Sequence, residues 1–238
     1  NASSGTQNMI AATIGLPAAD WQGVSNKSSG AVLTAITNVA DGKAIDGGPT
    51  SDPDAVKKTM GILASDVADS NRQTLKPLAF QDVGQSCGWY PDSTASSFDK
   101  ANVRDGHYPI WGPSHLIAYA DTNGNETNTA VKTLIDAMDG RNSQVLATLD
   151  VIAFYAKSHI IPTCAMHVQR ADDGHDYKPY APITSCSCYY DLQATGQTSC
   201  KSCSQDSDCA KAPGGATTCV NAFGIPPVGY CEPPGSSQ

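Results

Sequence analysis

The chain has 238 residues, of which 40% are hydrophobic, and its net charge is −8. This apolar content is enough for a folded core and argues against disorder of the whole chain, while the acidic balance argues against binding to nucleic acid, which requires basic patches. The longest apolar stretches fall far short of the roughly 20 residues that cross a bilayer, so we predict no transmembrane segment.

Helix signals open the chain. The segment 3–6, Ser-Ser-Gly-Thr, precedes an apolar run over 9–14, and a second polar segment over 26–30 precedes an apolar run over 32–36. Hydroxyl side chains ahead of an apolar run are typical of helix N-caps. A third short helix is predicted at Asp52-Pro53-Asp54, where proline suits the first helical turn.

Further along, the pattern alternates between strand and helix, as in α/β proteins. We expect buried strands over 59–63 and 75–80 and a strand entry over 108–111. Apolar residues at helical spacing predict two longer helices over 127–138 and 143–157. A polar and proline-broken stretch over 171–182 reads as a linker, and the residues beyond it show almost no periodicity.

Cysteine is the strongest compositional signal. Seven of the nine cysteines lie between Cys186 and Cys231. Such density is typical of a disulfide scaffold and of an oxidising compartment, here the periplasm, the cell surface or the medium. An odd number leaves one thiol free or bonded to another chain. The disulfide candidates are Cys87, Cys164, Cys186, Cys188, Cys200, Cys203, Cys209, Cys219 and Cys231.

The pair Cys200 and Cys203 has the C-x-x-C spacing of redox and zinc sites. A redox motif would sit at a helix start in a βαβ unit, and a zinc site would need a second pair at matching spacing. Neither context is present in the sequence. We therefore favour structural disulfides, which a core this small needs for stability.

The start of the first helix is a candidate anion site. Backbone N–H groups in a first helical turn have no internal partner, and the helix dipole places partial positive charge there. Gly5 lets a ligand approach the backbone, and Ser4 and Thr6 add hydroxyl donors, with Ser3 as a further candidate. Phosphate, sulfate or a carboxylate would suit such a site. The alternative is an ordinary N-cap with no ligand.

The order of short motifs resembles the second half of the phosphate-binding proteins of ABC transporters, which are type 2 periplasmic binding proteins. The motifs are Ser4-Gly5-Thr6, Trp21-Gln22-Gly23-Val24, Ser28-Ser29-Gly30-Ala31-Val32, Met60-Gly61-Ile62-Leu63 and Gly106-His107-Tyr108-Pro109-Ile110. The resemblance covers roughly residues 3–160. It implies two α/β lobes joined by a hinge, with an oxyanion bound by Ser4, Gly5 and Thr6. The family's Arg-x-Asp-Gly before this segment is not kept, because Ala2 and Ser3 stand at the Asp and Gly positions.

The resemblance also implies a domain organisation. Residues 1–109 would form the substrate-binding lobe, 110–175 a mainly helical return segment of the first lobe, and 176–238 a small, irregular, disulfide-stapled extension. The hinge would lie near Asp105–Ile110. The other ligand residues of the family lie in a lobe upstream of the residues that match here. We therefore expect a partner chain or an N-terminal lobe to complete the cleft.

Other candidate sites have simpler explanations. Asp121–Thr127 begins like a calcium loop but lacks the required Gly and Glu, so a turn and helix cap are favoured. A cluster of His167, Asp172, Asp173, His175 and Asp176 matches no compact zinc pattern and reads as a solvated linker. His107 and His115 read as hinge and core residues rather than as a site.

No enzyme signature is found in the sequence. The chain has no G-x-S-x-G elbow, no G-x-x-x-x-G-K-[ST] loop and no H-E-x-x-H motif. We predict no catalytic residue, no metal and no cofactor. The expected function is a secreted or periplasmic solute-binding protein that captures a small oxyanion such as phosphate and serves an ABC transporter permease. The alternative is a structural or adhesive surface protein that uses the same fold as a scaffold.

Overall fold

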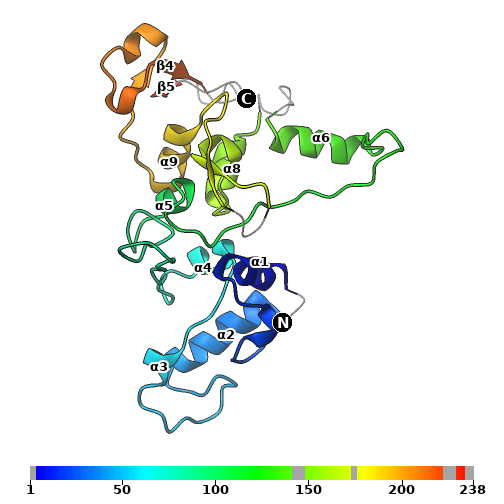
Figure 1. Ribbon diagram of the computed structural model, residues 1–238, viewed down its shortest axis with the longest axis vertical. Helices are drawn as coiled ribbons and strands as arrows, with labels where there is room; N and C mark the ends of the chain where they lie inside the picture. The colour runs from blue at the N-terminus through cyan, green and yellow to red at the C-terminus, as the bar shows by residue number, and fades with distance from the viewer. Residues whose placement is uncertain (1–3, 141–147, 173–175, 222–228, 234–238) are drawn as a thin grey trace. The chain divides into compact units, whose positions relative to one another are not determined.

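The structure is a computed structural model that describes residues 4–140, 148–172, 176–221 and 229–233. The chain folds as two compact units (Figure 1). The chain passes from one unit to the other several times, for example between Pro91 and Asp92 and between His107 and Tyr108. Unit 1 comprises residues 1–91, 108–112 and 171–176, and unit 2 comprises residues 92–107, 113–170 and 177–238.

Unit 1 is built from helices. They are α1 (Gly5–Ile14), α2 (Ser29–Ala40), α3 (Ala55–Lys58), α4 (Ser65–Ser70) and a 3-10 turn, η1 (Ala18–Asp20). The hydroxyls of Ser4 and Ser28 accept backbone N–H groups in the first turns of α1 and α2. Gly15 ends α1 in the left-handed region, with φ 66°. The predicted starts of α1 and α2 are therefore confirmed, because capping depends on neighbouring residues only. The third predicted helix is present as α3, but it begins at Ala55, so Pro53 lies ahead of its first turn, and Asp54 forms no side-chain cap.

The strands predicted for unit 1 are wrong. Residues 59–63 and 75–79 have no regular structure, and 108–111 are likewise irregular. A strand requires a partner, and within the described part of unit 1 only isolated bridges occur, such as that between Phe80 and Trp89. Met60, expected to be buried, is 73% exposed. Gly61 instead passes over α2 so closely that a Cβ atom would lie 2.4 Å from Ile36 Cδ1.

Unit 2 has a helical core. Its helices are α5 (Ala101–Arg104), α6 (Thr129–Met138), α8 (Val151–Lys157) and α9 (Ser187–Thr195), with a 3-10 turn η2 (Thr163–Ala165). Helices α8 and α9 pack side by side (Figure 1). The buried core contains Ile152, Ala156, Ala165, Cys186, Tyr189 and Tyr190. Residues 143–147 of the predicted helix over 143–157 lie outside the described residues. In the described part of this segment, α8 begins at Val151, after its cap Asp150.

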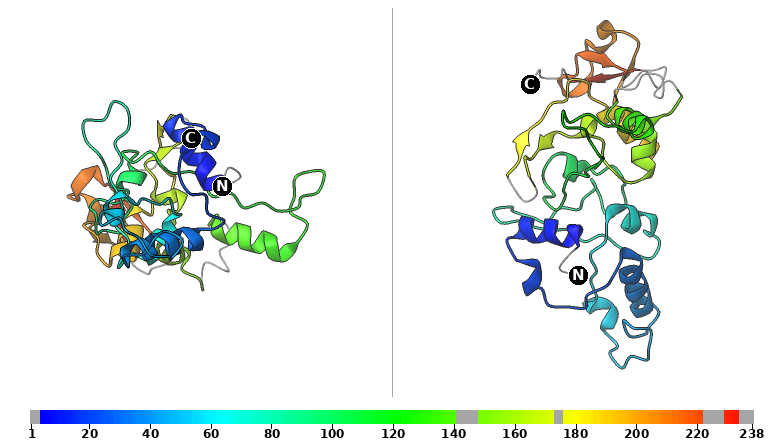
Figure 2. Two further views of the ribbon diagram at one scale, coloured as in Figure 1. Left: turned by 90° about the horizontal axis from the view of Figure 1, so that it is seen from below. Right: turned by 90° about the vertical axis from the view of Figure 1, so that its right-hand side faces the viewer.

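The remainder of unit 2 carries small antiparallel sheets. Strand β1 (Val168–Gln169) pairs with β2 (Lys178–Pro179), so part of the predicted linker is a strand. Strand β5 (Gly229–Glu232) lies between β3 (Ser202–Cys203) and β4 (Thr218–Val220). Figure 2 shows this region in orange and red. The 3-10 turns η3 (Asp206–Cys209) and η4 (Pro213–Gly215) lie within the same region.

The cysteine-rich region is more ordered than predicted. Residues 176–238 contain α9 and the three-stranded sheet, in a segment that was expected to be irregular. The hydrophobic periodicity of the sequence did not indicate α9. Consecutive residues of this helix, Tyr189 and Tyr190 among them, are buried, so the sequence lacks the apolar stripe opposite a polar face that marks an amphipathic helix. The α/β fold of a type 2 binding protein stays a prediction, since the described residues form helices and small antiparallel sheets only.

Four disulfides hold this region together. They join Cys164 to Cys186, Cys188 to Cys200, Cys203 to Cys219, and Cys209 to Cys231. Cys87 is the free thiol left by the odd number, and it is exposed. The predicted disulfide scaffold is confirmed. Cys200 and Cys203 belong to different disulfides, so their C-x-x-C spacing forms no redox pair.

Candidate functional site

The start of α1 has the local geometry of an anion site. Ser4 caps the helix in an extended conformation, and its hydroxyl accepts the Gln7 N–H at 3.4 Å. The N–H groups of Gly5 and Thr6 find no acceptor among the described residues. Among the described residues, a Cβ atom at Gly5 would meet no atom within 4 Å beyond its chain neighbours and its own helix backbone. Ser3, the further candidate, lies outside the described residues.

The start of α2 repeats this capping arrangement and provides an internal comparison. Ser28 adopts an extended conformation, and its hydroxyl accepts the Ala31 N–H at 3.2 Å. Gly30 is the second residue of α2, whereas Gly5 is the first residue of α1, so the two glycines occupy different positions in their first turns. The two helix starts thus share their capping chemistry.

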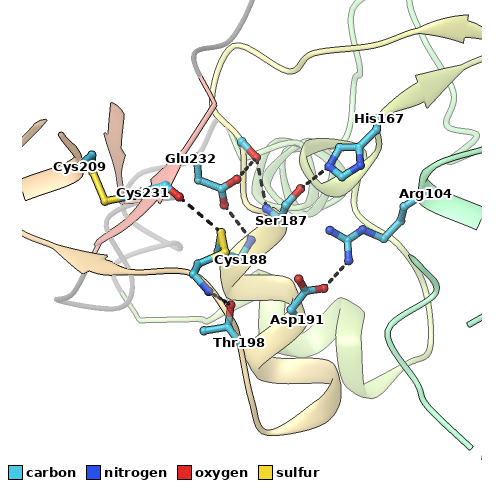
Figure 3. Close-up of a disulfide and its surroundings, with 11 residues drawn as sticks. Arg104, His167, Ser187, Cys188, Asp191, Thr198, Cys209, Cys231 and Glu232 are labelled. Atoms are coloured by element: carbon cyan, nitrogen blue, oxygen red, sulfur yellow. Dashed lines mark hydrogen bonds and ion pairs between the residues drawn. A yellow bond between two sulfur atoms is a disulfide. The ribbon is translucent and has the colours of Figure 1, made fainter. Parts of the chain in front are cut away.

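The start of α9 already holds a carboxylate. The Cys188 N–H donates to Glu232 Oε1 at 2.8 Å, and the Ser185 hydroxyl donates to Glu232 Oε2 at 2.7 Å. Glu232 is 2% exposed. Burial raises its pKa, whereas the hydrogen bonds from Ser185 and Cys188 favour the charged form. Figure 3 shows the carboxylate directed at the first turn of the helix.

A second cluster of polar side chains surrounds α9. His167 Nδ1 lies 2.6 Å from Asp105 Oδ1. Its Nε2 lies 3.0 Å from Ser187 Oγ, as Figure 3 shows. The hydrogen bond from His167 is the main reason why the pKa of Asp105 is lowered. The order Asp–His–Ser matches the connectivity of a serine hydrolase relay. These residues come from three separate segments of unit 2.

The surroundings of Ser187 do not suit a nucleophile. A relay also needs free N–H groups to stabilise the oxyanion of the substrate. Here the Ser187 N–H donates to the Ser185 hydroxyl and the Cys188 N–H donates to Glu232, so both amides at this helix start are occupied. Ser187 itself is buried, with 7% exposure. We interpret the chain of hydrogen bonds as a structural link between α5, α9 and the segment before β1.

Arg104 is the buried cation of the same cluster. Its Nε donates to the Ala165 carbonyl at 2.8 Å, its Nη1 forms an ion pair with Asp191, and its guanidinium lies over the Tyr190 ring. Burial is the largest influence on Asp191 and raises its pKa, with Arg104 acting in the opposite direction. An open cavity of about 450 Å³ lies beside this ion pair. Its lining includes Asp99, Asp105, His167 and Thr198.

Asp121 and the cysteines singled out from the sequence have structural partners, whereas His115, predicted as a core residue, is exposed because residues 113–117 do not pack into a core. Asp121 accepts the backbone N–H groups of Asn123 and Asn125, so its carboxylate closes a turn, and Asn128 caps α6. The Cys203, Cys209 and Cys231 sulfur atoms lie within 4.8 Å of one another, but all three belong to disulfides and offer no thiolate to a metal. Asp173 and His175 of the predicted polar cluster lie outside the described residues.

The sequence pointed to His167 for a reason that the structure does not support. It was grouped with neighbouring carboxylates, whereas its ring contacts Asp105 and Ser187, which lie 62 and 20 positions away. No local motif connects these three residues. Arg104 and Asp191 likewise lie 87 positions apart. Only the packing of α5 against α9 brings them together, so a single sequence gave no signal for this cluster.

Comparison of the chain with protein-family models, with curated proteins and with solved structures finds no match in any of the three. Within the residues that the structure describes, no helix combines the length and the apolar character needed to cross a membrane. The four disulfides fit a secreted or extracellular protein.

Proposed function

We propose that the protein is a secreted or periplasmic solute-binding protein that captures a small oxyanion, phosphate first, at the start of α1. The open start of this helix carries the proposal. Among the described residues, the N–H groups of Gly5 and Thr6 face no acceptor, and a Cβ atom at Gly5 would meet no atom within 4 Å beyond its chain neighbours and its own helix backbone. Binding would be non-covalent, because amide and hydroxyl donors complement a negative charge without forming a bond.

The start of α9 supports this chemistry. It shows that a helix start in this protein accommodates a carboxylate when the chain supplies one, namely Glu232. The two helix starts differ in that the Glu232 carboxylate of the same chain occupies the start of α9, whereas no described residue accepts the Gly5 and Thr6 N–H groups at the start of α1. By analogy, the donors at α1 would hold an anion from solution. Water competes for donors at an exposed turn, so one helix start alone should bind weakly.

We therefore propose that a partner chain or an additional lobe completes the binding cleft, and that an ABC transporter permease receives the solute. The proposed hinge near Asp105–Ile110 has some support, since the chain passes between its two units at His107 and Tyr108. Gly106 within this segment has φ +78°, a conformation that glycine adopts readily. Capture coupled to closure of two lobes is a common switching mechanism.

Isothermal titration with sodium phosphate, sulfate and acetate tests the proposal. The informative variant is Ser4→Asp, because aspartate still caps the helix while its charge repels an anion. We expect heat of binding for the unmodified protein and an affinity at least about tenfold lower for Ser4→Asp, which corresponds to about 1.4 kcal/mol.

Ser28→Asp at the start of α2 is the matched control and should leave the affinity unchanged. Far-ultraviolet circular dichroism should show that both variants keep their helices. The absence of heat with all three anions would refute the proposal, as would equal affinities for Ser4→Asp and the unmodified protein.

The second candidate function is a structural or adhesive role at a cell surface. The exposed thiol of Cys87 favours it, because such a thiol is available for a bond to another chain. Electrophoresis without reducing agent tests this role. A covalent oligomer that disappears in Cys87→Ser would support it, and a monomer in the oxidised protein would oppose it.

A further inference from the structure

The segment 113–120 of unit 2 is an extended chain without a partner. It has neither helix nor strand structure, and Figure 1 shows it as a green stretch that leads toward α6. Within the described residues, no backbone hydrogen bond engages residues 113–119, and Ala120 alone forms a bridge, to Glu126. A row of unpaired N–H and C=O groups in an extended chain is a template for another strand.

The side chains of this segment suit a buried strand. Ile117 is 93% exposed and Tyr119 is 92% exposed, and both face the same side of an extended chain because side chains alternate with period two. Leu116 on the other side is 53% exposed. β-Branched and aromatic residues are favoured in strands. Apolar side chains and unpaired backbone groups thus coincide in one segment.

The charge distribution favours a second copy of this chain as the occupant. Between Tyr108 and Ala120 the sequence contains no Asp, Glu, Lys or Arg, although the chain as a whole carries a net charge of −8. Natural sheet edges usually carry charged side chains that prevent pairing between copies. This segment lacks that protection, so two copies approach here without like charges opposing each other.

We infer that segment 113–120 pairs antiparallel with the same segment of a second copy of this chain. A two-fold axis at Ile117 would place Ile117 opposite its own copy and His115 opposite Tyr119 of the partner. Ring-bearing side chains directly opposite each other stabilise antiparallel pairs. The pairing satisfies the backbone groups and covers the apolar side chains at once. It is independent of the anion proposal, because it concerns unit 2 and involves no anion.

Sedimentation velocity over a range of protein concentrations tests this pairing. All proteins carry Cys87→Ser, so that no disulfide links the copies. We expect a reversible monomer–dimer equilibrium, with a dimer dissociation constant at least about tenfold weaker in Ile117→Lys, where two like charges would face each other. Val83→Lys is the matched control, because Val83 is also apolar and fully exposed but lies in unit 1.

Mixing two charge variants tests the register. Ile117→Lys and Ile117→Glu should each be weaker dimers alone and should form a heterodimer when mixed, since opposite charges would then meet at the axis. A monomer at every concentration would overturn the inference. This outcome is also the one expected if a different protein covers the segment. A dimer insensitive to Ile117→Lys, or a mixture that forms no heterodimer, would overturn the proposed pairing.

Discussion

Single polar side chains connect the helices of unit 2. His167 joins Asp105 at the end of α5 to Ser187 at the start of α9. Arg104, the last residue of α5, forms an ion pair with Asp191 in the middle of α9. A buried guanidinium requires acceptors for its N–H groups, and the Ala165 carbonyl and the Asp191 carboxylate supply them. These contacts set the position of α5 relative to α9.

The pair of Asp105 and His167 predicts a dependence of stability on pH. Because the pKa of Asp105 is lowered in the folded state, ionised Asp105 stabilises the fold above its unfolded pKa, near 3.8. This contribution is lost as the pH falls from about 3.8 through the lower folded pKa. We expect Asp105→Asn to lower the melting temperature at pH 6 and to make little difference at pH 2, as measured by circular dichroism.

His167→Gln serves as the companion variant, because it removes the imidazole ring and leaves a side chain able to form hydrogen bonds. It should reduce the effect of Asp105→Asn at pH 6, since the two residues form one pair. If Asp105→Asn shifted the melting temperature equally at both pH values, the pair would have no role in stability.

Helix α9 is the element that organises unit 2. Two disulfides hold its start, because Cys186 precedes it and Cys188 lies in its first turn. Glu232 joins that first turn to the end of β5. Tyr190 and Tyr189 on α9 contribute to the buried core with α8. The helix therefore links the core to the three-stranded sheet, and its start is the joint between them.

This arrangement predicts the effect of removing Glu232. In Glu232→Ala the Cys188 N–H and the Ser185 hydroxyl lose a buried acceptor, and we expect the free energy of unfolding to fall by about 2 kcal/mol. Glu232→Gln keeps a carbonyl oxygen for Cys188 and should cost less. Urea denaturation of the oxidised protein, followed by circular dichroism, measures both. A larger loss for Glu232→Gln than for Glu232→Ala would contradict the capping role.

The two units depend on different stabilising interactions. All four disulfides lie within unit 2, whereas unit 1 contains only the free Cys87. Among the described residues of unit 1, the buried apolar side chains are few and come mainly from α1 and α2, such as Ile10 and Val39. A disulfide contributes roughly 2–4 kcal/mol by restricting the unfolded chain. Unit 2 should therefore depend on its oxidation state, and unit 1 should not.

Reduction with dithiothreitol tests this difference. We expect amide hydrogen exchange to become faster over residues 186–221 and to stay unchanged in α1 and α2, as measured by mass spectrometry of peptic fragments. The oxidised protein under the same conditions is the control. Equal acceleration in α1 and in α9 would show that the two units unfold together.

The sequence by itself determined what depends on neighbouring residues. The starts of α1, α2 and α6 follow from Ser4, Ser28 and Asn128, since a cap needs only a hydroxyl or amide a few positions from the N–H that it accepts. The cysteine content determined that the chain is a disulfide scaffold with an odd thiol. The helix cap on which the proposed site at Ser4, Gly5 and Thr6 depends could be predicted for the same local reason, and the site itself stays a proposal.

Only the tertiary structure decided which distant segments meet. The apolar run over 59–63 resembles a strand, but a strand forms only with a partner, and here Gly61 packs on α2 instead. The disulfides Cys203–Cys219 and Cys209–Cys231 join segments of the three-stranded sheet and η3. The contacts of His167 with Asp105 and Ser187 likewise depend on how α5 and α9 meet. Residues 20 to 87 positions apart meet there because burial of Tyr190 and its neighbours brings them together, and no local pattern records that burial.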